Sequence, residues 1–161
     1  MTSSTALAQT AALLAKIPGG AALLDWFGGK PEFADAEIIE LRLDRKGPSL
    51  LRLAIYKVSE LRSDATQVQE TVVVSFFLKD MIDVSVEGFC QQNVIGGLEL
   101  SWADRKEIDD SLVGIGCELP DMEIAIKPCA GAFGLIRATI EQISISPPVS
   151  PEDRLLWDQE K

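Results

Sequence analysis

The order of apolar and polar residues divides the chain into a short helical part followed by a longer β-rich part. Residues 4–16 carry apolar side chains at helical spacing, and a Pro-Gly-Gly sequence at 18–20 interrupts that pattern. A second, shorter helix is predicted at 20–27. From residue 36 onward the apolar residues recur at every second position, which is typical of β-strands. The chain is therefore predicted to begin with one or two helices and to continue as a sheet.

Several segments have the alternation expected of strands. They span residues 36–44, 50–58, 68–78, 80–87, 98–102, 112–118, 121–127 and 134–146. The segment 68–78 is apolar on both faces, so we expect it to be central, with the N-terminal helix as its cover. In 134–146 the apolar positions change from even to odd numbers, which predicts a β-bulge near Glu141 and Gln142. Loops are expected at 60–66, 103–111 and 128–134, and Gly96 and Gly97 are expected to give flexibility before residue 98.

These elements predict an α+β fold, with one or two N-terminal helices packed on a largely antiparallel, curled β-sheet of six to eight strands. With 161 residues, the chain is long enough for one domain with a proper core. We expect a single domain over 1–161, with a helical part at 1–30, a β-rich body at 36–146 and a tail at 147–161. No apolar run approaches the length that would span a bilayer. The alanine-rich N-terminus is expected to be a helix and not a secretion signal, because no basic cluster precedes it.

The junction between the helical part and the sheet, residues 25–38, is rich in aromatic residues, glycine and proline. Gly28 can take a positive φ and so end the preceding helix. Trp26 and Phe27 are interpreted as a plug that seals the core where helix meets sheet, and Phe33 is a third aromatic residue of the same junction. Asp35, just before the first strand, is expected to accept backbone N–H groups and hold the turn.

The charge of the chain is strongly negative and unevenly distributed. The formal net charge is −10, yet residues 1–60 hold seven acids and seven bases, so the whole excess lies after residue 60. The acids are densest between residues 99 and 123. This field disfavours nucleic acid and anionic membranes as partners and favours a basic protein. Acidity for solubility alone is the alternative interpretation.

The acid-rich stretch is the predicted surface for binding a partner. Its carboxylates are Glu99, Asp104, Glu107, Asp109, Asp110, Glu118, Asp121 and Glu123. Trp102 would be an aromatic anchor on this surface if its side chain faced outward. Because Trp102 alternates in phase with Leu98 and Leu100, however, the pattern predicts that it lies in the core.

The residues most often used in catalysis are scarce. The chain has no histidine, which removes the commonest general base and the most frequent transition-metal ligand. Its three cysteines, at irregular spacing, indicate a reducing compartment and are expected to be small buried side chains. We expect no enzymatic activity, no cofactor and no metal. Asp35 and Glu37, two residues apart, are the carboxylates that a hydrolase would use. Gln92 and Asn93 are expected to hold a loop through backbone hydrogen bonds.

Short motifs lie along most of the chain after residue 22. They are Trp26-Phe27-Gly28, Pro31-x-Phe33-x-Asp35-Ala36-Glu37-Ile38, Leu41-x-Leu43-Asp44-Arg45, the strand from Phe77 to Val84 with Asp80 and Asp83, Gly88-Phe89-x-x-Gln92-Asn93-Val94-Ile95, and Leu98. Together they resemble the immunity protein 50 family of bacterial polymorphic-toxin systems. The resemblance implies a small cytoplasmic protein that binds and neutralises a cognate toxin for self-protection. It does not identify the toxin.

The sequence therefore favours a toxin-neutralising immunity protein that binds its toxin stoichiometrically through an acidic surface. The cognate toxin domain is expected to be basic, and a homodimer stays open. Two alternatives of other classes remain: a non-catalytic ligand-binding or oligomeric scaffold domain, and a hydrolase that depends on the carboxylates of Asp35 and Glu37.

Overall fold

The computed structural model describes residues 4–58, 69–104, 106 and 119–149. The predicted loop at 60–66, the predicted strand at 112–118 and most of the predicted loop at 103–111 lie outside these residues, as does the tail beyond residue 149. Within the described residues, no helix has both the length and the apolar character needed to cross a bilayer.

Two short helices open the chain, as the apolar spacing predicts. Helix α1 spans Ser4–Leu14 and α2 spans Gly20–Trp26. The turn between them lies directly on the last strand, where the N–H of Ile143 donates to the carbonyl of Pro18 over 2.8 Å. A Cβ on Gly19 would lie 1.8 Å from the Ile143 carbonyl oxygen, and Gly19 has a φ of 84°. Only glycine fits this approach.

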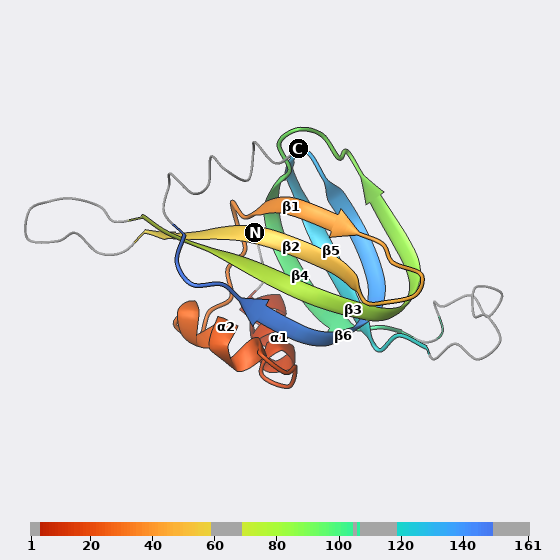
Figure 1. The fold of residues 1–161 in the computed structure, drawn as a ribbon. Coiled ribbons are helices and arrows are strands. Elements are labelled where there is room, and N and C mark those ends of the chain that lie inside the picture. Colours follow the sequence, from red (N-terminus) through yellow and green to blue (C-terminus); the bar gives the residue numbers. More distant parts are fainter. Residues whose placement is uncertain (1–3, 59–68, 105, 107–118, 150–161) are drawn as a thin grey trace, which may run out of the picture.

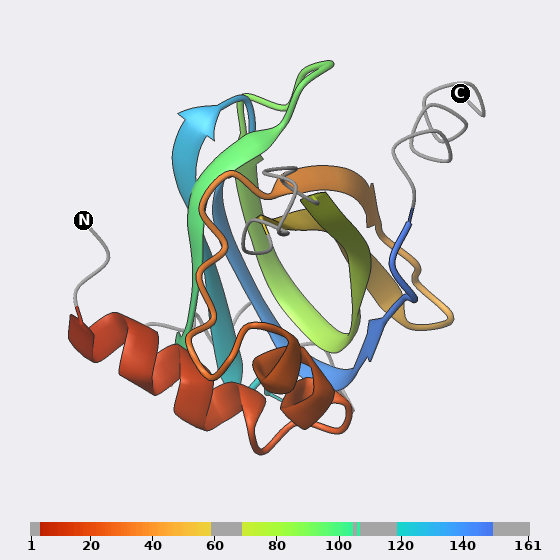
Figure 2. The same ribbon diagram turned by 90° about the vertical axis from the view of Figure 1, so that its left-hand side faces the viewer.

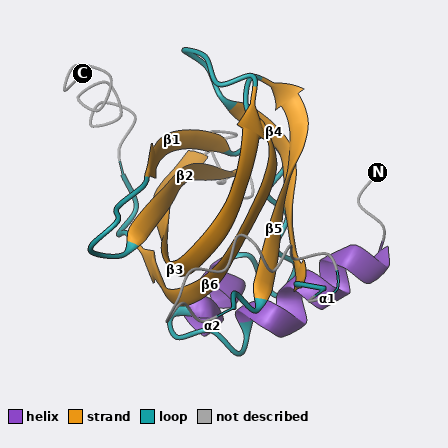
Figure 3. Ribbon diagram, turned by 90° about the vertical axis from the view of Figure 1, so that its right-hand side faces the viewer, coloured by secondary structure: helices purple, strands orange, loops and turns teal. Residues whose placement is uncertain are grey.

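Within the described part of the chain, six antiparallel strands follow and close into a barrel (Figure 1). They are β1 (Glu37–Arg42), β2 (Ser49–Val58), β3 (Gln69–Glu87), β4 (Val94–Trp102), β5 (Met122–Ala130) and β6 (Phe133–Ile145). Their order around the barrel is β1-β2-β3-β6-β5-β4. The α+β fold with N-terminal helices on an antiparallel, curled sheet is thus confirmed. Figures 2 and 3 show both helices at one end of the barrel.

The core fills the inside of the barrel with the inward side chain of every second residue. On β3 these are Val72, Val74, Phe76 and Leu78, all at most 1% exposed. Across the β2–β3 pair, Leu51 lies opposite Phe76 and Leu53 opposite Val74. The same face continues through β6 and β5, so apolar side chains from all the strands meet around one axis. Burial of this shared face is the main driving force for the fold.

Strand β3 departs from the prediction in two ways. The two strands expected at 68–78 and 80–87 form one strand, which bends where Asp80 has a φ of 50° and the pairing with β6 shifts register. Its outer face at Val73 is not covered by the N-terminal helix, because α1 packs on β4 and α2 on β6. The segment after β6 continues the sheet beside β3: the N–H of Ser146 donates to the Val73 carbonyl and the N–H of Val149 to the Thr71 carbonyl.

Strands β4 and β5 are longer than the alternation predicts. Gly96 and Gly97 lie within β4, and a Cβ on Gly96 would be 2.6 Å from the Pro128 carbonyl oxygen. The first of these glycines therefore allows close packing of two strands and does not act as a flexible linker. Strand β5 runs to Ala130, so the loop expected at 128–134 is reduced to a tight turn before β6.

The bulge predicted in the last strand is confirmed. On β6, Gln142 lies opposite Phe77 and Ile140 lies opposite Leu78, so Glu141 has no partner in the register. This extra residue moves the inward positions from even to odd numbers and keeps both Ile140 and Ile143 buried.

The barrel closes at a short seam between β1 and β4. Between the described residues of these two strands, the only pair in register is Glu37 with Val94. Backbone bonds extend the seam: the N–H of Ile38 donates to the Asn93 carbonyl, the N–H of Ile95 to the Ala36 carbonyl, and the N–H of Asp35 to the Ile95 carbonyl. Asp35 takes a φ of 65° in this arrangement, a conformation that aspartate tolerates better than most residues.

The residues just before the seam plug the end of the barrel. Trp26, Phe27, Phe33 and Phe76 form a continuous row, with ring centroids 5.1, 5.0 and 6.4 Å apart in that order. The first two contacts are edge-to-face, a favourable arrangement for aromatic rings. Phe33 is 2% exposed and carries the row from the helical part into the barrel interior. This row joins the helices to the sheet.

Removal of the Phe33 ring should therefore destabilise the whole domain. We expect Phe33→Ala to lower the free energy of unfolding by about 3–5 kcal/mol, because it leaves a cavity between Phe27 and Phe76. Urea denaturation followed by circular dichroism measures the change. Phe89→Ala is the matched control, since Phe89 is 56% exposed and should cost less than about 0.5 kcal/mol. A cost below that of the control would contradict the role of the plug.

The β1–β2 turn is held by a carboxylate. Asp44 Oδ1 accepts the backbone N–H of Lys46 at 2.8 Å and that of Gly47 at 3.1 Å. These two bonds favour the ionised form and lower the pKa of Asp44 below its ordinary value of 3.8. A lowered folded-state pKa means that the carboxylate stabilises the fold above that ordinary value and that this contribution disappears as pH falls through the folded pKa.

We therefore expect Asp44→Asn to lower the urea midpoint at pH 7 and to have a smaller effect at acid pH. The difference from the unmodified protein should narrow as pH falls below about 4 and vanish once Asp44 is protonated in both states. Urea midpoints measured across this range provide the test. A difference that stayed constant with pH would show that the charge of Asp44 contributes nothing to the turn.

Candidate functional site

Trp102 is a large apolar side chain that the fold leaves uncovered. It is the last residue of β4 and is 51% exposed, although its cross-strand partner Met122 is 5% exposed. The prediction that Trp102 lies in the core is therefore wrong. Its phase with Leu100 is as predicted, but at the end of the strand no described layer covers that face. Its side chain is exposed, as the role of an aromatic anchor requires.

The surroundings of Trp102 contain both signs of charge. The ammonium nitrogen of Lys16, just after α1, lies 5.6 Å from the centre of the Trp102 ring, a cation–π contact. The chain then enters the connection from β4 to β5, residues 103–121, which has six acids and two bases. Its ends are joined by a bond from the N–H of Ala103 to the carbonyl of Asp121. Trp102 thus lies at the base of the most acidic segment of the chain.

Of the eight predicted binding carboxylates, the structure describes Glu99, Asp104, Asp121 and Glu123. The other four, Glu107, Asp109, Asp110 and Glu118, lie outside the described residues. Asp104 and Asp121 are exposed at the two ends of the connection that begins after Trp102. Asp104 Oδ1 also accepts the backbone N–H of Lys106 at 2.9 Å.

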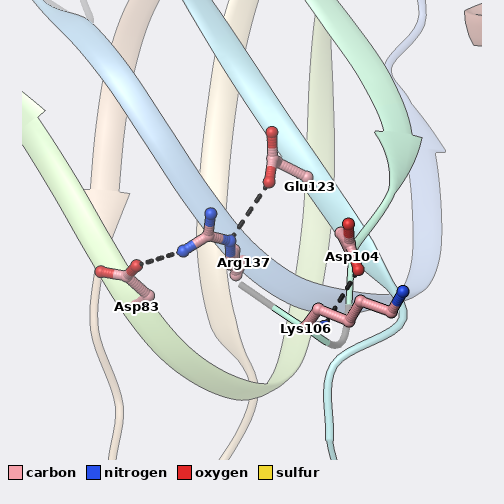
Figure 4. Close-up of polar contacts among 5 residues, drawn as sticks. All are labelled: Asp83, Asp104, Lys106, Glu123 and Arg137. Atoms are coloured by element: carbon pink, nitrogen blue, oxygen red, sulfur yellow. Dashed lines mark hydrogen bonds and ion pairs between the residues drawn. The ribbon is translucent and has the colours of Figure 1, made fainter. Parts of the chain in front are cut away.

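Glu99 and Glu123 belong to the barrel wall and not to a free acidic surface. Glu99 Oε2 lies 3.2 Å from the ammonium nitrogen of Lys127 on the neighbouring strand. Glu123 Oε2 lies 3.1 Å from Nε of Arg137, whose Nη1 lies 2.8 Å from Asp83 Oδ2 (Figure 4). Both glutamates are therefore paired with a cation within the fold. Among the described residues, the predicted surface narrows to Trp102, Asp104 and Asp121.

Arg137 links three strands on the outside of the barrel. Its side chain is 14% exposed and lies between Asp83 of β3 and Glu123 of β5, as Figure 4 shows. A guanidinium is well suited to bridge two carboxylates because its donors lie in one plane. Sequence alternation places Arg137 on the outer face, but only the order of the strands brings both carboxylates to it.

The other predicted residues hold the fold. Trp26, Phe27 and Phe33 form the plug, and Gly28, with a φ of 69°, follows α2. Asp35 has an exposed side chain and acts in the seam through its backbone N–H. This residue precedes β1 and has a positive φ, so it does not share a strand face with Glu37. Glu37 instead accepts the hydroxyl of Tyr56 at 3.3 Å.

The loop before β4 is organised by Asn93, as expected. Asn93 Oδ1 accepts the N–H of Cys90 at 2.9 Å and that of Ala132 at 3.3 Å, and its Nδ2 donates to the Cys90 carbonyl. Gln92, in contrast, is exposed, and its backbone carbonyl contacts the Cys90 sulfur at 3.1 Å.

The prediction that the cysteines are buried is wrong for both that the structure describes. Cys90 and Cys129 are exposed free thiols, while Cys117 lies outside the described residues. The cause is position: Cys90 lies in a loop, and Cys129 is near the end of β5, where the last four residues of the strand are exposed. Across the described part of the chain, no group of three or more acidic or cysteine side chains is arranged to hold a metal ion.

Comparison with known proteins gives no match to the chain among family models, curated proteins or solved structures. The resemblance to the immunity protein 50 family therefore stays a prediction.

The contribution of the Arg137 ion pairs to stability can be tested by mutation. We expect Arg137→Met to lower the free energy of unfolding by about 2 kcal/mol, because Asp83 and Glu123 then face each other without a cation. Arg42→Met is the matched control. The Arg42 side chain is 58% exposed and lies 3.9 Å from Glu40, and the loss of this ion pair should cost less than about 0.5 kcal/mol.

Adding Asp83→Asn and Glu123→Gln to the Arg137→Met protein should restore part of the lost stability, since the repelling charges are then gone. Urea denaturation of the four proteins measures both effects. If Arg137→Met lowered the free energy of unfolding no more than Arg42→Met, the ion pairs of Arg137 would not contribute to stability.

Proposed function

We propose that the protein is a stoichiometric binding protein that neutralises a basic toxin domain, acting in the cytoplasm and without turnover. The observation that carries the proposal is the exposure of Trp102 at the base of the acid-rich connection. The family resemblance supplies the class of partner, and the geometry around Trp102 supplies a place for it to bind.

Trp102 has the properties of a binding anchor. Tryptophan is among the residues most enriched at the energetic centre of protein interfaces, where it fills a pocket on the partner. Here 51% of its surface is available, and its backbone is fixed by pairing with Met122 in the barrel. A side chain presented from a rigid strand loses little conformational freedom on binding, which favours affinity.

The charge around Trp102 favours a cationic partner. Asp104 and Asp121 are exposed beside it, and the connection 103–121 has an excess of four acids. Such a field attracts a basic surface and can raise the association rate by about 10–1,000-fold at low salt. A toxin that attacks nucleic acid carries a basic surface for its substrate, and an acidic binder can occupy it. In this account the charge sets the association rate, and the aromatic anchor slows dissociation.

The first test is genetic and biochemical. The chain is co-expressed with the protein encoded immediately upstream, and both growth rescue and co-purification are scored. The proposal expects rescue together with a stable complex of defined stoichiometry. Rescue without a complex would indicate turnover of a toxic product and would contradict the proposal.

Trp102→Ala should weaken the complex by about thirtyfold, corresponding to about 2 kcal/mol for an interface anchor, without lowering the stability of the free protein. Phe89→Ala is the matched control, because Phe89 is also more than half exposed but lies on the loop before β4. Binding kinetics for both variants at several salt concentrations give the measurement. The association rate should fall steeply with salt. An unchanged dissociation rate in Trp102→Ala would contradict the role of the anchor.

A further inference from the structure

A second site lies next to the aromatic plug, at the end of β2. It is a pocket of about 440 Å³, within the size range of small-molecule sites. Its lining consists of Trp26, Phe27, Lys30, Glu32, Tyr56 and Lys57. The pocket is independent of the surface around Trp102, because it shares no residue with it.

The aromatic walls of this pocket, which we call the plug pocket, are held in place. The indole N–H of Trp26 donates to Glu70 Oε1 at 2.8 Å, and the Tyr56 hydroxyl donates to Glu37 Oε2 at 3.3 Å. Phe27 is fixed between Trp26 and Phe33 by edge-to-face contacts. Ring faces whose orientation is already fixed can bind a flat apolar body with little loss of entropy.

Two lysines give the plug pocket a cationic side. The ammonium nitrogen of Lys57 lies 5.5 Å from the centre of the Trp26 ring and donates to the Trp26 carbonyl over 2.9 Å. That contact uses one of its three N–H donors and holds the ammonium at the pocket. Lys30 is exposed on the lining.

The acids near the pocket limit the charge of a ligand. Glu32 is part of the lining, and Glu70 and Glu37 accept hydrogen bonds from Trp26 and Tyr56, two of its aromatic residues. A ligand with several negative charges would be repelled by these carboxylates, whereas a single negative charge can be neutralised between the two lysines. The lining thus favours a monoanion with a flat apolar body.

We propose that the plug pocket binds a small aromatic monoanion, with its ring against Phe27 and Tyr56 and its anionic group between Lys30 and Lys57. Charge-assisted hydrogen bonds from the two ammonium groups fix the orientation of the ligand. This site gives the protein a small-molecule ligand in addition to the protein partner proposed above.

The test uses anilinonaphthalene sulfonate, a fluorescent aromatic monoanion, and phenylnaphthylamine, its uncharged analogue. Both are titrated into the folded protein at 0.15 M salt. The proposal expects the anion to bind about tenfold more tightly than the neutral analogue, as the loss of a charge-assisted bond implies.

The double variant Lys30→Gln/Lys57→Gln should weaken binding of the anion about tenfold and leave binding of the neutral analogue unchanged. Lys46→Gln/Lys79→Gln is the matched control, since it removes two exposed lysines outside the plug pocket and changes the net charge equally. Circular dichroism verifies that both variants are folded. Equal weakening in the two variants, equal affinity for the two probes, or no binding of the anion would each overturn the proposal.

Discussion

The entry of Phe33 into the mouth of the barrel is the contact on which the rest of the molecule depends. This ring meets Phe76 on the inside of β3 and Phe27 on the helical side, so it joins the two parts of the chain through one row of aromatic residues. The residues that follow it form the seam with Ile95 and close the barrel. One segment of the chain therefore both plugs the core and completes the sheet, and its aromatic composition reflects these two tasks.

Because the barrel is closed and plugged, side chains at its ends can serve binding without weakening the core. Trp102 projects from the end of β4, beside a connection with excess acid. Tyr56 and Lys57 are near the end of β2, where the helical part supplies the remaining walls of the plug pocket. The two places have opposite character, since one offers an aromatic ring among carboxylates and the other a hollow with two lysines. The two places therefore favour different kinds of ligand.

Much of the fold could be predicted from the sequence, because alternation along a strand depends only on local geometry. The register shift at Glu141 followed from the change of phase in 134–146, and the helices followed from apolar spacing. What could not be predicted depended on neighbours distant in sequence. Gly96 was expected to be flexible, but the Pro128 carbonyl lies against it, and the N-terminal helix packs on β4 and not on the outer face of β3 at Val73.

The candidate site was likewise predictable only where it depends on the local sequence. The acid-rich stretch was visible in the sequence, but the partners of Glu99 and Glu123 depend on which strands are adjacent. Alternation correctly gave the face of Trp102 and not its exposure, because the pattern does not say where the barrel ends. The plug pocket was missed entirely, since its lysines and aromatic rings come from separate elements and have no common spacing.

Hydrogen–deuterium exchange of the free protein and of its complex with the cognate toxin tests the central claim most directly. The account predicts that the newly protected amides cluster in the last residues of β4, the connection 103–121 and the start of β5. Protection confined to the opposite loops, around residues 88–93 and 131–133, with no change near Trp102, would contradict it.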